Sequence, residues 1–175
     1  MTEKQRIGLT QIYTGTGKGK TTATLGLAFR ASGQGLKVIF IQFVKGRGAC
    51  GEHLAAQKSG LFEIVHLNTE DHFKQQEGAV KQTVQQTLKL AKDTIRNGCY
   101  DMVILDEIFI ALKLKQITEE QVLEFIRSKP PQVELVLSGR YAPASIMELA
   151  DLVSEIKPLK HPKDKGVAAR CGIEF

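Results

Sequence analysis

A glycine-rich segment near the start of the chain has the residue types of a phosphate-binding loop. It runs from Gly15 to Thr22 and reads Gly-Thr-Gly-Lys-Gly-Lys-Thr-Thr. Glycines let the backbone turn so that successive N–H groups point at an anion, and a helix that begins there adds partial positive charge. Lys20 would supply a full charge, and the Thr21 hydroxyl is placed to ligate Mg²⁺ held between phosphates. The predicted nucleotide-binding residues of the loop are Gly15, Thr16, Gly17, Lys18, Gly19, Lys20, Thr21 and Thr22.

This loop is one residue shorter than the usual pattern, which places four residues between its first glycine and Gly-Lys-Thr. The position of that first glycine is Thr14 here, and counting from Gly15 leaves only three residues. Lys18 is an additional cation inside the loop. We therefore expect the loop to hold phosphates differently from that of an ordinary kinase or GTPase.

Two adjacent carboxylates follow a second apolar run. Asp106 and Glu107 come directly after residues 102–105, which are predicted to form a buried strand. Ligands of open α/β sheets lie outside the carboxyl ends of the strands, where a nucleotide-binding fold needs an acid that organises Mg²⁺. The predicted metal ligands are therefore Thr21, Glu107 and Asp106. The alternative interpretation is that these acids solvate the end of the strand or cap a helix.

A third polar segment follows the apolar run 133–137. It reads Ser138-Gly139-Arg140 and would lie at the same edge of the sheet. Arg140 is therefore a candidate ligand of a phosphate, with a surface salt bridge as the alternative.

The elements that would position these residues alternate along the chain between strand and helix, about five times over. Strands are predicted at 7–14, 36–44, 62–67, 102–105, 133–137 and 152–156. Helices are predicted at 21–32, 52–59, 80–95 and 118–129, with a short one after Pro143. Thr118-Glu119-Glu120-Gln121 fits a capping box that opens the helix at 118. Almost unbroken apolar runs are typical of parallel strands covered on both faces. The pattern predicts a three-layer α/β fold, with a mainly parallel sheet and helices on both faces, as in RecA-like P-loop NTPases.

The composition is that of an ordinary globular domain. The chain has 175 residues, of which 42% are hydrophobic and 25% charged, and this excludes collagen, coiled-coil and disordered classes. One nucleotide-binding domain over residues 1–175 is predicted. No apolar run approaches the roughly 18 residues of a membrane span, so no membrane partner is expected. Cys50, Cys99 and Cys171 have no metal-ligand spacing and are predicted to be reduced thiols of a cytoplasmic protein.

The charge is unevenly distributed. Residues 1–60 carry nine Lys and Arg against two acids, whereas residues 61–175 carry fifteen against seventeen. Such an excess attracts polyanions, and charge alone leaves open whether the anion is a nucleic acid or a nucleotide phosphate. Aromatic residues make up only 6% of the chain, and the basic residues gather around the glycine loop. Both features argue against a nucleic-acid partner.

The motifs and their surroundings together resemble the P-loop-type ATP:corrinoid adenosyltransferases. The resemblance covers nearly the whole chain, and the shortened loop and the Lys-His-Pro segment near the end are its most specific parts. The segments that carry it are Tyr13 to Thr22, Ile41 to Gly46, Val103 to Glu107, Ala150 to Glu155, Lys157 to Pro162, Gly166 and Gly172 to Phe175.

The resemblance implies a reaction and its participants. The 5′-deoxyadenosyl group of ATP would move to the Co(I) centre of a corrinoid such as cobalamin, with release of triphosphate, in adenosylcobalamin synthesis or salvage. Because Co(I) is itself a strong nucleophile, the protein needs no Ser-His-Asp set, nucleophilic cysteine or general base. Lys18 and Lys20 would stabilise the leaving triphosphate, and Glu107 would help to hold Mg²⁺ or Mn²⁺. A homodimer and a flavodoxin-like or other reductant are further expectations.

The part of the chain that would face the corrinoid departs from the family. The family has a segment close to Gly-Phe-Thr-Trp there, whereas this chain has no Trp and reads Asn-Thr-Glu-Asp-His-Phe at residues 68–73. His72 and Phe73 are the candidates to replace the aromatic pair. Lys160 and His161 are candidates to close over the triphosphate or the corrinoid, although a lysine-rich tail is also commonly a solvated end of the chain.

Two other functions remain open at this point. The first is a phosphotransferase or nucleic-acid-stimulated ATPase on the same kind of sheet, which the glycine loop and the basic first third of the chain would also fit. The second is a non-catalytic paralogue that binds ATP or a corrinoid, which the missing aromatic pair would fit.

Overall fold

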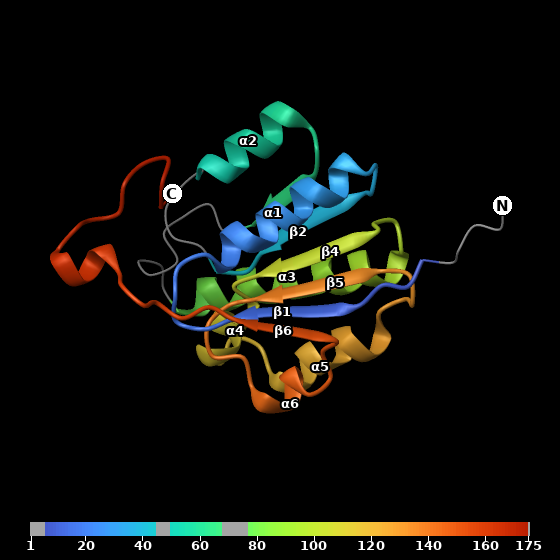
Figure 1. Cartoon of the computed structure of the whole chain (residues 1–175). Helices are drawn as coiled ribbons and strands as arrows, with labels where there is room; N and C mark the ends of the chain where they lie inside the picture. The colour runs from blue at the N-terminus through green and yellow to red at the C-terminus, as the bar shows by residue number, and fades with distance from the viewer. Residues whose placement is uncertain (1–5, 45–49, 68–76, 175) are drawn as a thin grey trace.

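Six strands form one parallel sheet in the computed structural model, which describes residues 6–44, 50–67 and 77–174. The strand order is β3-β2-β4-β5-β1-β6, and every neighbouring pair is parallel (Figure 1). The strands are β1 (Thr10–Thr14), β2 (Val38–Gln42), β3 (Glu63–His66), β4 (Met102–Asp106), β5 (Glu134–Ser138) and β6 (Leu152–Glu155). The prediction of a mainly parallel α/β sheet is confirmed.

Helices cover both faces of this sheet, as the apolar runs of its strands require. They are α1 (Lys20–Gly33), α2 (Gly51–Ser59), α3 (Glu77–Asn97), α4 (Ile108–Lys113), α5 (Glu119–Ser128) and α6 (Ala144–Met147), followed by a 3₁₀ turn, η1 (Pro162–Lys165). Helix α1 packs on one face and α3, α4, α5 and α6 on the other, while α2 lies beside β3 at the edge (Figure 1). No described helix is both long enough and apolar enough to cross a membrane.

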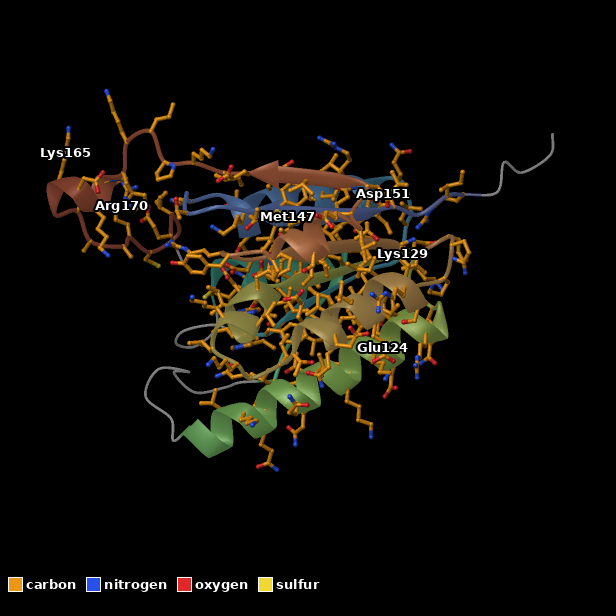
Figure 2. The ribbon with its side chains drawn as sticks, turned by 90° about the horizontal axis from the view of Figure 1, so that it is seen from below. Glu124, Lys129, Met147, Asp151, Lys165 and Arg170 are labelled. Atoms are coloured by element: carbon orange, nitrogen blue, oxygen red, sulfur yellow. The ribbon has the colours of Figure 1, made fainter. Side chains whose placement is uncertain are left out.

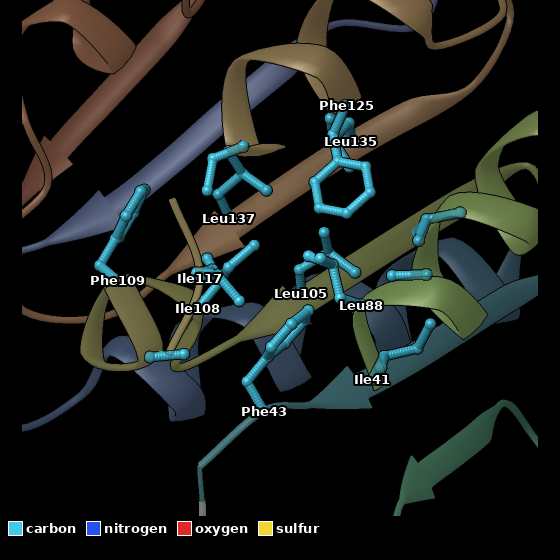
Figure 3. Close-up of a cluster of buried hydrophobic side chains, with 14 of the residues drawn as sticks. Ile41, Phe43, Leu88, Leu105, Ile108, Phe109, Ile117, Phe125, Leu135 and Leu137 are labelled. Carbon is cyan, nitrogen blue, oxygen red and sulfur yellow. The ribbon is translucent and has the colours of Figure 1, made fainter. Parts of the chain in front are cut away.

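The core is divided by the sheet into two apolar layers. The larger layer lies under α3, α4 and α5, where Leu88, Leu105 and Phe125 meet (Figure 3). The smaller one lies under α1, where Ala28 packs among strand residues such as Ile104. Because side chains alternate along a strand, the residues that end the central strands fall on the same face as the smaller layer. Their polar groups therefore lie beside the start of α1.

The elements differ from the sequence prediction at a few places. The predicted strand 36–44 is shorter, Val38–Gln42, and α4 was not predicted. Six residues are too few to show a helical period, so the apolar run 108–112 gave no signal of a helix. The capping box at Thr118 is confirmed, because its Oγ1 accepts from the Gln121 amide at 3.3 Å while the Gln121 side chain accepts from the Thr118 amide at 2.8 Å.

Candidate active site

The glycine loop joins β1 to α1, and the chain beyond β6 holds it in place. The amide of Ile156, the residue after β6, donates to the Thr14 carbonyl at 2.8 Å, and the Ile156 carbonyl accepts from the Gly17 amide at 2.8 Å. Gly19, with φ of 122°, precedes the first residue of α1. The expectation that successive loop amides all face an anion is therefore not met at Gly17, whose N–H is used by Ile156.

This close approach of Ile156 explains why glycines are needed in the loop. A Cβ on Gly15 would lie 2.3 Å from the Ile156 carbonyl oxygen, and the φ of Gly15 is 103°. A Cβ on Gly17 would lie 2.9 Å from a side-chain methyl of Ile156. Both contacts are shorter than packed atoms tolerate, so a side chain at either position would push Ile156 and the loop apart.

Lys20 is the buried cation of the loop, with 5% of its surface exposed. Its Nζ donates to the Gly17 carbonyl at 2.8 Å. The pKa of Lys20 is lowered mainly by burial. The charge of Arg140 lowers this pKa further, whereas the charges of Glu107 and Asp106 act to raise it. The ammonium group is thus held in a place that disfavours its charge, and a polyanion beside it would offset that cost.

Asp106 ends β4 and is 1% exposed. Its carboxylate accepts from the Thr21 hydroxyl at 3.2 and 3.3 Å, from Gln42 Nε2 at 3.2 Å and, in a short contact, from the Ser138 hydroxyl. Gln42, Asp106 and Ser138 end three neighbouring strands, β2, β4 and β5. Alternation along these strands places all three side chains on the face that α1 covers, which is why they meet Thr21.

Glu107 has a backbone conformation that only a few residues adopt. Its φ is 56°, in the left-handed region, and its amide donates to the Ser138 hydroxyl at 3.2 Å. Gly139 lies against it, and a Cβ there would come within 3.4 Å of Glu107 Oε2. Non-glycine residues held in this region cluster at functional sites. The turn directs Glu107 toward the cavity described next.

A cavity of about 480 Å³ opens over the start of α1. It is lined by Gly17, Lys18, Gly19, Lys20, Thr21, Thr22, Leu25, Gly51, Glu52, Glu107, Arg140, His161, Gly172, Ile173 and Glu174. Strand ends, α1, α2 and the segment after β6 thus converge on one space. Its cations, glycines and hydroxyls suit a nucleotide phosphate chain.

The cavity brings together most of the residues that the sequence predicted. The loop residues 17–22 line it together with Glu107, Arg140 and His161. Gly15, Thr16 and Asp106 are absent from its lining, and Asp106 contacts Thr21 instead. Lys160 is exposed and also outside the lining. His72 and Phe73 lie outside the described residues.

The segment after η1 contributes site residues that the sequence reasoning did not name. Lys18 Nζ contacts Glu174 Oε1 at 2.9 Å and the Ile173 carbonyl at 3.2 Å. Hydrogen bonds from Arg170 and Lys18 lower the pKa of Glu174 to about 2. Figure 2 shows Lys165 and Arg170 at one end of the molecule, on the tail beyond β6. The family resemblance at residues 172–175 was the sequence feature that could have indicated a role for this segment at the site.

Comparison with known proteins identifies the family. The family model described as "ATP:corrinoid adenosyltransferase BtuR/CobO/CobP" matches residues 6–175. The chain belongs to this family. It is 35% identical to the corrinoid adenosyltransferase of Escherichia coli K12, over 96% of this chain and 86% of that protein. A corrinoid adenosyltransferase from Sinorhizobium sp is also 35% identical, over 99% and 83%, and one from Salmonella typhimurium LT2 is 33% identical, over 96% and 86%.

A solved structure with a similar fold is the flagellar accessory protein FlaH from Methanocaldococcus jannaschii. The TM-score is 0.54 at 13% sequence identity, and the match covers 86% of this chain and 71% of that one. At this identity the likeness concerns the fold alone. It supports the predicted α/β fold.

Proposed function

We propose that this protein transfers the 5′-deoxyadenosyl group of ATP to the Co(I) centre of a corrinoid and releases triphosphate. The observation that carries the proposal is the family match over residues 6–175. The cavity over the glycine loop adds support, because its lining combines cations with the start of a helix.

The first proposed role of the site is to hold the triphosphate. Lys20 comes from the floor of the cavity and Lys18 from its rim, and Arg140 adds a third cation. In the transfer, a cobalt–carbon bond forms at the ribose 5′ carbon while the bond from that carbon to oxygen breaks. The electron pair of that bond leaves with the triphosphate. Lys18 and Lys20 then stabilise the negative charge that develops on the leaving group, and no protein base is required.

The second proposed role is to hold Mg²⁺ or Mn²⁺ beside the phosphates. The residues present fit such an ion, because the Thr21 hydroxyl touches the Asp106 carboxylate at 3.2 Å and Glu107 lines the same cavity. Hydroxyl and carboxylate oxygens are the ligands that Mg²⁺ prefers. When bound, the ion would neutralise charge on the leaving triphosphate.

The third proposed role concerns the corrinoid. His161 lines the cavity, and its Nδ1 accepts from the Lys163 amide at 3.1 Å, which orients the ring. We propose that Lys160 and His161 close over the bound triphosphate or corrinoid, and that His72 and Phe73 contact the corrinoid.

The proposal also includes one domain over residues 1–175, a cytoplasmic location, a homodimer and a flavodoxin-like or other reductant. Cys50, Cys99 and Cys171 form no disulfide in the described part of the chain, which fits a reducing compartment.

The experiment that tests the function follows both products. The protein is incubated with ATP, Mg²⁺ and a chemically reduced corrinoid, and the reaction is followed by the absorbance of the alkylated corrinoid and by chromatography of the phosphates. We expect equal amounts of adenosyl-corrinoid and triphosphate, and neither without the reductant. Diphosphate or phosphate as the only product would identify a phosphotransferase or ATPase. Tight binding of ATP without transfer would identify a non-catalytic paralogue.

A further inference from the structure

A line of polar side chains connects α2 to Asp106 through the interior. Gln42 is 1% exposed, and its Nε2 donates to Asp106 Oδ2 at 3.2 Å. Its Oε1 lies 2.6 Å from Nε2 of His53, which is on α2. The Nδ1 of His53 accepts from the Cys50 amide at 3.0 Å. The start of α2 and the end of β4 are therefore joined by three consecutive hydrogen bonds.

The backbone contact of His53 determines which of its ring nitrogens carries the proton. Because Nδ1 accepts from a backbone N–H, it has no proton of its own, and the proton of the neutral ring is on Nε2. Nε2 is then a donor, and the atom of Gln42 that faces it is the carbonyl oxygen. Each contact in the line has a donor opposite an acceptor.

The donor on His53 in turn determines how the Gln42 amide faces Asp106. A glutamine can exchange the positions of its oxygen and nitrogen by rotation, and the reversed amide would place its oxygen against a buried carboxylate. It would also place the Gln42 amide nitrogen against the Nε2–H of His53, so that two acceptors face each other at one end and two donors at the other, which is costly in a low-dielectric interior. His53 holds Gln42 in the orientation that donates to Asp106.

We propose that His53 is a positioning residue of the phosphate site, which acts through Gln42 on the carboxylate of Asp106. Oδ1 of Asp106 is held from β5 by Ser138, and Oδ2 from β2 by Gln42. Between these two donors the carboxylate faces the Thr21 hydroxyl. The expected consequence is a higher affinity of the ATP-loaded protein for its divalent ion. This inference rests on the proposed role of Asp106 at the metal end of the site.

The surroundings of His53 support a fixed ring. The rings of His53 and His66 are stacked, with centroids 5.6 Å apart and planes 10° from parallel. Gly51 and Glu52, at the start of the same helix, line the phosphate cavity. His53 thus follows two residues of the cavity wall, and a rotation of its ring would break its contacts with Cys50, Gln42 and His66.

Two substitutions at this position separate the two hydrogen bonds of the ring. In His53→Gln the new amide nitrogen replaces Nε2, so the donor to Gln42 is kept while the acceptor for the Cys50 amide is lost. In His53→Asn the side-chain oxygen replaces Nδ1, so the helix contact is kept while the donor to Gln42 is lost. Asp106→Asn serves as the reference for losing the carboxylate itself.

The direct measurement is Mn²⁺ binding to the complex of protein and ATP without corrinoid, followed by electron paramagnetic resonance. Loss of a group that orients a ligand weakens metal binding by about 10- to 100-fold, and we expect His53→Asn to fall in this range. We expect His53→Gln to bind Mn²⁺ within about twofold of wild type, although it lacks the helix contact and has a lower melting temperature. In adenosyl transfer, His53→Asn should need more Mg²⁺ for half-maximal rate but reach a similar kcat at saturation.

Each other outcome overturns the inference in a distinguishable way. If Asp106→Asn weakens Mn²⁺ binding and His53→Asn does not, Asp106 keeps its role and His53 has none. If both His53 variants weaken binding in step with their melting temperatures, the role of His53 is structural. If Asp106→Asn itself binds Mn²⁺ normally, the metal role of Asp106 is wrong and the inference falls with it. Should His53→Asn fail to fold, Gln42→Met tests the same link and should weaken Mn²⁺ binding equally.

Discussion

Replacing Lys20 by methionine should separate catalysis from stability. Methionine has a similar length and remains apolar, so it fills the buried position without the charge. Lys20 is 5% exposed, and its pKa is lowered mainly by burial. The buried charge therefore lowers the free energy of unfolding of the wild type. The Lys20→Met variant lacks this destabilising contribution.

The substitution should lower kcat/KM without lowering the melting temperature. Loss of one preorganised donor to a developing oxyanion costs about 2.7–4 kcal/mol, or a factor of about 10²–10³ in rate. We expect kcat/KM to fall in that range, because Lys20 Nζ lies at the floor of the phosphate cavity, 2.8 Å from the Gly17 carbonyl. The melting temperature should be equal to or higher than that of wild type.

The pH dependence of stability gives a second measure of the same group. A lowered pKa means that the unfolded chain binds more protons than the folded one at alkaline pH. The free energy of unfolding of the wild type should therefore rise relative to the Lys20→Met variant as the pH approaches 10.5, the ordinary value for lysine. Below the lowered pKa of the folded state, the difference between the two proteins should be constant.

The assay is initial-rate formation of adenosyl-corrinoid and triphosphate, with calorimetry on the same samples. Lys89→Met is a matched control, since Lys89 is exposed on α3, and both of its values should equal those of wild type. Activity of Lys20→Met within twofold of wild type would refute the catalytic role. A fall in melting temperature parallel to the loss of activity would refute the account of Lys20 as a strained, buried charge.

Three further substitutions test the surroundings of the loop. Gly15→Ala brings a Cβ within 2.3 Å of the Ile156 carbonyl at a φ of 103°, so urea denaturation should show a loss of at least about 1–3 kcal/mol. Glu174→Gln removes the anion that holds Lys18 at 2.9 Å, so isothermal titration should show tighter binding of ATP, and weaker binding would contradict this. Thr118→Ala loses the N-cap of α5 and should cost about 1 kcal/mol with unchanged kcat, which makes it a control for stability alone.

The sequence was most informative where local chemistry decides structure. The alternation of apolar runs and helices predicted the parallel sheet, because strands that are buried on both faces have nearly continuous apolar sequences. The capping box at Thr118 was predicted because its two hydrogen bonds lie within four residues. Loop residues 17–22, Glu107 and Arg140 were predicted from their places after strands, and all of them line one cavity.

The sequence was least informative about contacts that join distant parts of the chain. Nothing near the glycine loop indicates that Ile156 uses the Gly17 amide, since the two are brought together only by the pairing of β1 with β6. Similarly, His53 belongs to no motif, and its link to Asp106 depends on the neighbouring positions of β2 and β4. Such contacts follow from strand order, which local patterns do not specify.

The position of β6 determines two contacts of the glycine loop. By pairing with β1, β6 leads the chain to Ile156 and across the glycine loop, where Gly17 gives its amide to Ile156 instead of an anion. The loop thereby has one amide fewer for phosphates, and it is also one residue shorter than usual. The same path carries the tail on to Glu174, which contacts Lys18 at the rim. The acceptor of the Gly17 amide and the anion that faces Lys18 thus both come from the chain beyond β6, so this part of the chain determines which loop groups are available to a phosphate.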